Sequence, residues 1–216
     1  NGQTRDTWLM RNTYGQQLTP AWRLLGKFNI SRSSNSEGAF YDGNFHEAVI
    51  GAAYRPVDND RWNTLVKLTS YNNVPTAGQL DSNGRIADCA QKSQVFSVDT
   101  IWDVKPWMSL GFKYGLRVGK LRMNKTEGDW FFSRADLVVL RADWHWVREW
   151  DIVTEVRKLR AKEARDARAG ALAAVYKHVG KHVKAGVGYN FTNYSDDLTD
   201  LSYRSRGWFI NVLSTF

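Results

Sequence analysis

The chain has 216 residues and carries 30 Lys and Arg against 22 Asp and Glu, for a formal net charge of +8. One domain, residues 1–216, is expected at this length, and no stretch approaches the roughly 20 consecutive apolar residues of a membrane-spanning helix. Aromatic residues are abundant, with 10 Trp, 9 Tyr and 10 Phe, although the mean hydropathy is only −0.49. This composition excludes helical membrane spans and permits a membrane β-barrel with outward aromatic girdles and a polar lumen.

The first residues of the chain and its single cysteine bear on processing and on disulfide or metal sites. Asn1 to Asp6 contain no basic and apolar leader, so we expect either that a signal peptide has been removed or that this is the tail of a longer protein. Cys89 has no second cysteine to pair with, which excludes an intramolecular disulfide and argues against a cysteine-based metal site. No cofactor is expected.

Turn-forming residues divide the chain into short and long connections that alternate. The short connections, rich in Pro, Asp, Asn and Gly, are 17–21, 56–60, 105–107, 147–150 and 179–182. The long polar connections are 32–44, 73–93, 122–130, 160–169 and 192–206. A meandering outer-membrane barrel has tight turns at its periplasmic rim and longer loops at its outer rim, so this alternation favours such a barrel.

The segments between the connections show the period of two that is typical of strands. Apolar and polar residues alternate in 22–31, 108–118 and 183–192. The segments are roughly 9 to 13 residues long, which suits tilted strands that cross a bilayer. Eleven strands are expected, starting at Thr7, Trp22, Phe45, Arg61, Gln94, Met108, Phe132, Asp151, Gly170, Val183 and Gly207.

The predicted fold class is therefore all-β, an antiparallel up-and-down transmembrane β-barrel. Because bacterial barrels usually have an even strand count, a twelfth strand from residues upstream of Asn1 is predicted.

Two alternatives to this fold stay open. Residues 161–179 are rich in Ala, Lys, Glu and Arg and would also suit an amphipathic helix. A soluble antiparallel barrel or sandwich would show the same period of two, with its apolar side inside.

Aromatic residues gather near the short connections, where a girdle at one membrane interface is expected. The predicted girdle residues are Trp22, Tyr54, Trp62, Trp102, Trp107, Trp144, Trp146, Trp150 and Tyr176.

Charged residues on the opposite face of the strands are expected to line the lumen. They are Arg23, Lys27, Lys67, Asp99, Asp103, Lys113, Arg117, Arg141, Asp143, Glu155, Arg157 and Lys184. Opposite charges on neighbouring strands would pair and fill a narrow lumen. The alternative is a hydrated, weakly anion-preferring pore.

The final segment, Gly207 to Phe216, ends on an aromatic residue. It resembles the last strand of Gram-negative outer-membrane barrels, which the barrel-insertion machinery recognises. The resemblance implies that this machinery is a partner and that the assembly signal consists of Trp208, Ile210, Val212 and Phe216. Asn211 and Ser214 depart from the pattern, since such signals often have Gly and an apolar residue there.

Two further segments, 52–61 and 187–201, resemble the C-terminal outer-membrane barrel domains of large Gram-negative surface proteins, of the OmpA-like or autotransporter-like kind. The resemblance covers nearly the whole chain. It implies a bacterial outer-membrane location, with long loops outside and the C-terminus in the periplasm. It also implies that the barrel anchors, and helps to export, an N-terminal passenger or other surface protein.

Other site types have weaker support. The sequence has no Gly-x-Ser-x-Gly elbow, no metal-spaced His cluster and no paired carboxylates beside a nucleophile, so no enzyme activity is expected. Asp196, Asp197 and Asp200 suit either a calcium site or a solvated turn. Outer-membrane lipid and lipopolysaccharide are expected partners. The loop residues Lys162, Arg165 and Arg168 suit either phosphate contacts or a solvated charge run. Basic residues are spread among the strands, which argues against nucleic acid.

Overall fold

The computed structural model describes residues 5–35, 44–72, 90–122, 128–147, 149–180, 183–192, 198 and 206–214. These residues form one antiparallel sheet of eleven strands, and each strand pairs with its neighbours in sequence. The strands are β1 (Arg5–Gln17), β2 (Trp22–Asn35), β3 (Phe45–Tyr54), β4 (Trp62–Asn72), β5 (Ala90–Lys105), β6 (Met108–Arg122), β7 (Phe131–Val147), β8 (Trp150–Ala161), β9 (Asp166–Val179), β10 (Val183–Asn190) and β11 (Gly207–Ser214). The predicted all-β, up-and-down architecture is confirmed. No helix among the described residues is long and apolar enough to cross a membrane.

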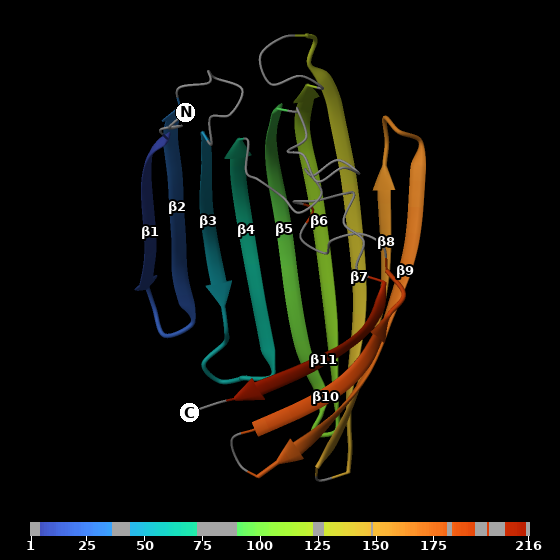
Figure 1. Ribbon diagram of the computed structural model, residues 1–216. Coiled ribbons are helices and arrows are strands. Elements are labelled where there is room, and N and C mark those ends of the chain that lie inside the picture. The colour runs from blue at the N-terminus through green and yellow to red at the C-terminus, as the bar shows by residue number, and fades with distance from the viewer. Residues whose placement is uncertain are drawn as a thin grey trace.

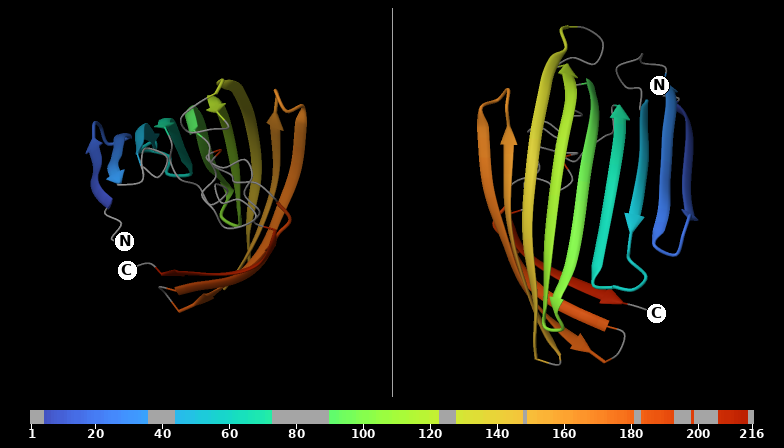
Figure 2. Two further views of the ribbon diagram at one scale, coloured as in Figure 1. Left: turned by 45° about the horizontal axis from the view of Figure 1, so that its top comes forward. Right: turned by 180° about the vertical axis from the view of Figure 1, so that it is seen from behind.

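The sheet curls into an incomplete ring, with β1 and β11 as its two edges (Figures 1 and 2). Strands β10 and β11 and the lower end of β9 cross below the other strands, and the ring is open between β11 and β1 (Figures 1 and 2). Within the described part of the chain, these two edge strands do not pair with each other. A twelfth strand between them stays a prediction.

The two faces of the sheet differ in chemistry, as a period of two requires. On the convex face, large apolar side chains are exposed, including Ile50 at 64%, Leu68 at 52% and Leu140 at 52%. On the concave face, alternate residues are buried, including Val95 and Leu137. Apolar residues that face outward from the ring indicate a barrel whose outer surface meets lipid.

The connection between β8 and β9 differs from its prediction. Residues 160–169 were expected to form a long loop, but the strands are paired as far as Ala161 and Asp166, which leaves a four-residue turn. Arg165 closes this turn with a positive φ of 49°, and the backbone N–H of Lys162 donates to the carbonyl oxygen of Arg134 on β7 at 2.9 Å. Residues 161–179 are therefore turn and strand, and the helical alternative is wrong.

Candidate functional site

Three cross-strand aromatic pairs lie beside the short connections. Their ring centroids are 4.7 Å apart for Trp22 and Tyr54, 6.1 Å for Trp62 and Trp102, and 6.0 Å for Trp107 and Trp144. Each pair joins two neighbouring elements at the same end of the sheet, which is the arrangement expected of an interfacial girdle.

The other three predicted girdle residues have different outcomes. Trp150 is 43% exposed, with the ammonium of Lys177 5.5 Å from its ring centre. The side chain of Trp146 lies outside the described residues. The placement of Tyr176 in the girdle is wrong, because it pairs with Asp151 and Gly186 on the concave face and has the ammonium of Lys184 4.9 Å from its ring.

The strand register places the predicted lumen charges on the concave face, and a larger polar cluster joins four strands there. Its centre is Asp151 on β8, whose side chain is only 5% exposed. One carboxylate oxygen lies 2.7 Å from Nδ1 of His145 on β7, and the other lies 2.8 Å from Nε2 of His178 on β9. Lys184 on β10 forms an ion pair with the same carboxylate. Asp151 and His178 were not predicted, because nothing in the sequence indicates that a residue beside a turn faces three donors.

Pairing between neighbouring strands was expected for the lumen charges. Two other charge pairs instead join residues of the same strand. Arg141 Nε donates to Asp143 Oδ1 at 2.9 Å on β7, and Glu155 pairs with Arg157 on β8. Residues two apart on a strand point to the same face, so a long guanidinium can reach the carboxylate beside it. Both members of the Glu155–Arg157 pair are 10% exposed, so this pair fills space inside the curled sheet.

Arg117 holds a residue of the β10–β11 connection inside the ring. Its guanidinium donates to the Leu198 carbonyl oxygen at 3.2 Å, to Gln91 Oε1 at 3.2 Å and to Ser93 Oγ at 3.3 Å. The Tyr71 ring lies 5.6 Å away. Arg117 is 6% exposed, so these neutral acceptors replace the water that a buried cation would otherwise need.

Leu198 itself is 1% exposed and belongs to an apolar cluster on the concave face. Leu137 and Val95 are members of the same cluster. On Gly115, an added Cβ would lie 2.8 Å from Leu198 Cδ1, so the glycine leaves the space that the leucine occupies. Leu198, a residue of a long connection, thus lies deep among the strands, which no periodicity in the sequence could have indicated.

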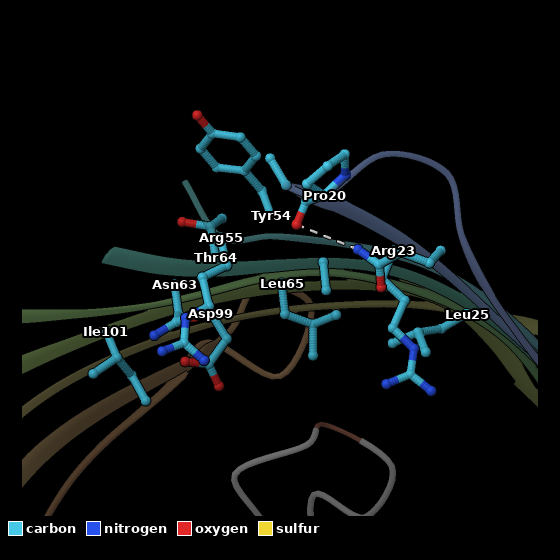
Figure 3. Close-up of a pocket in the computed structure, with 13 residues that line it drawn as sticks. Pro20, Arg23, Leu25, Tyr54, Arg55, Asn63, Thr64, Leu65, Asp99 and Ile101 are labelled. Atoms are coloured by element: carbon cyan, nitrogen blue, oxygen red, sulfur yellow. Dashed lines mark hydrogen bonds between the residues drawn. The ribbon is translucent and has the colours of Figure 1, made fainter. Parts of the chain in front are cut away.

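The β2 to β6 part of the concave face carries several lysines. A pocket of about 320 Å³ is lined by Lys27, Lys67 and Lys113, and Lys27 Nζ lies 2.9 Å from Glu47. A second pocket of about 590 Å³ lies nearer the short connections and includes Arg23 and Asp99 (Figure 3). At the turn between β5 and β6, Ser109 Oγ donates to Asp103 Oδ1 at 2.5 Å.

The predicted assembly signal lies on the free edge strand β11. Trp208, Ile210 and Val212 are exposed by 79%, 82% and 62%. Trp208 packs edge-on against Tyr189 of β10, with centroids 5.2 Å apart. Phe216 and the acidic residues Asp196, Asp197 and Asp200 lie outside the described residues.

Comparisons with known proteins address the fold. A scan against protein-family models finds no match, and a search of curated proteins finds none. Among solved structures, the chain is similar to a NanC porin in a rhombohedral crystal form, at 9% identity and a TM-score of 0.52. The similarity covers 100% of this chain and 98% of the porin chain. At this identity the likeness shows the fold alone, which is a porin-like β-barrel.

Proposed function

We propose that this chain is an outer-membrane β-barrel with an occluded interior that anchors a larger surface protein. The observation that carries the proposal is Leu198, which is buried on the concave face and bonded to Arg117. A barrel built for passage needs a continuous hydrated path, whereas an anchor needs only a stable outer surface. The apolar convex face and the aromatic pairs beside the short connections support the membrane location.

In this proposal the short connections face the periplasm and the long loops face outward. The free edges of β1 and β11 cannot stay open in hydrocarbon, because each unpaired backbone group there costs several kcal/mol. A twelfth strand closes the ring in this account.

Deletion of residues 1–216 from the full-length protein tests the anchor. We expect the remaining protein to leave the outer-membrane fraction and appear in the soluble fraction. A protein that stays in the membrane after the deletion has another anchor, and the proposal fails. Direct attachment of Asn1 to a signal peptide would likewise leave nothing to anchor and would favour a free-standing pore.

A passive, weakly anion-preferring channel is the second candidate. The basic pocket around Lys27, Lys67 and Lys113 favours it, and so does the likeness to a porin. In a channel, these lysines would raise the local concentration of anions. Ion conductance distinguishes the two candidates, because a barrel closed around Leu198 does not pass ions steadily.

A further inference from the structure

A polar groove interrupts the apolar convex face near the long-loop end of the sheet. It has a volume of about 400 Å³ and crosses β3 to β7. Its outward-facing polar lining includes His46, Ser70, Asn72, Gln94, Lys92 and Lys120. Nearer the middle of the same strands, the corresponding positions are apolar and exposed, for example Leu68 and Phe96. Polar side chains on a lipid-facing surface require a partner that hydrocarbon cannot supply.

Positive charge is concentrated at one end of this groove. Lys92 and Lys120 are direct cross-strand partners on β5 and β6. Lys92 Nζ and the Arg122 guanidinium carbon each lie 4.9 Å from the centre of the Trp130 ring. Like charges directly opposite each other on a sheet are destabilising. None of the described residues that line the groove is acidic. An anion bound in the groove would therefore compensate the positive charge of the lysine pair.

Two buried polar atoms near the groove have no hydrogen-bond partner within the described structure. One is Asn72 Oδ1, an acceptor on a groove residue, and the other is Arg134 Nε, a donor. Arg134 is the cross-strand partner of Val118, which also lines the groove. A buried polar atom without a partner costs about 1 to 3 kcal/mol. Both atoms are buried, so rotation of the Asn72 and Arg134 side chains toward the groove would let a ligand that accepts and donates hydrogen bonds satisfy them.

We propose that this groove binds the phosphorylated sugar headgroup of an outer-leaflet glycolipid. Phosphate oxygens match the lysine pair and the guanidinium groups, and sugar hydroxyl or amide groups match Asn72. Phe132, which is 52% exposed, and Val118 lie in the same groove and offer apolar contacts to the acyl chains. The inference rests on the proposed orientation, which puts the long-loop end of the sheet at the outer leaflet.

The test compares two variants of the full chain, purified and folded in detergent. Lys92→Gln combined with Lys120→Gln removes the lysine pair. Lys177→Gln is the matched control, because Lys177 also lies over a tryptophan ring but at the opposite end of the sheet. The probes are bisphosphorylated lipid A, the same lipid after phosphate removal, and phosphatidylglycerol, with binding measured by native mass spectrometry.

Bisphosphorylated lipid A should bind the wild type and the Lys177→Gln control alike. A basic residue near an anionic surface contributes about 1 kcal/mol, so the double variant should bind about 30-fold more weakly. Without lipid, the double variant should be about as heat-stable as the wild type, because the lost contact of Lys92 with the Trp130 ring offsets the relieved repulsion between the lysines. Weaker binding together with unchanged stability excludes misfolding as the cause.

Three results would overturn the inference. They are equal binding by the wild type and the double variant, equal binding of the dephosphorylated lipid, and equal binding of phosphatidylglycerol. Cell fractionation of the same variants separates this failure from failure of the proposed function. A barrel that reaches the outer membrane but does not distinguish these lipids retains the proposed function and loses only the lipid site.

Discussion

Replacement of Asp151 by Asn tests whether the polar cluster on the concave face stabilises the barrel. The change keeps the shape of the side chain and removes the negative charge that His145, His178 and Lys184 share. Removal of one partner from a buried ion pair typically costs 3 to 5 kcal/mol. The Lys184 and histidine side chains are 26% to 44% exposed, so solvent screens part of this interaction and we expect a loss of about 2 to 3 kcal/mol.

Urea unfolding of the barrel in lipid vesicles, followed by tryptophan fluorescence, measures this loss. Asp143→Asn is the matched control, because within the described part of the chain Asp143 pairs with Arg141 alone, which is 46% exposed. The control should lose less than about 1 kcal/mol. If Asp151→Asn costs no more than the control, the four-strand cluster does not stabilise the fold and the reasoning is wrong.

Three further predictions follow from the geometry. In a chain whose native Cys89 is replaced by serine, an impermeant maleimide on intact cells should label Asp129→Cys and leave Asp58→Cys unlabelled, and the reverse pattern would contradict the proposed orientation. Gly115→Val should displace Leu198 and increase ion leakage through the purified barrel in vesicles, whereas unchanged leakage would show that Leu198 does not limit passage. Trp102→Ala should lower the free energy of unfolding by about 1 kcal/mol more than the loss of buried area alone would, because the ring contact with Trp62 is lost. An unchanged urea midpoint would show that the girdle pair does not stabilise the barrel.

Much of the fold was predictable because local rules decide it. Proline and glycine turns separate the strands, and the period of two in 108–118 correctly identified the inward positions of Lys113 and Arg117. Their place near the short connections put Trp62 and Trp102 in the predicted girdle, and the structure adds that the two rings pack against each other. These features depend on sequence spacing alone, so they need no knowledge of tertiary contacts.

Other features depend on contacts between distant residues and were missed. Residues 169–175 of β9 are all small or apolar, so this stretch shows no alternation that would tell which face Tyr176 takes, and the pairing with Gly186 decides it. The β8–β9 strands stay paired as far as Ala161 and Asp166, and their turn also bonds to Arg134 of β7. Leu198 enters the interior through its contacts with Arg117 and Gly115, which lie about 80 residues earlier in the chain.

Planar-bilayer recording of the purified barrel tests most directly whether the interior is closed. The contact of Leu198 with Arg117 predicts silence or brief noisy openings from the wild type. Leu198→Gly should then produce steady current steps, because it removes the buried side chain from the apolar cluster on the concave face. Stable, ohmic and anion-preferring openings of the wild-type barrel would contradict the occluded interior and favour a channel.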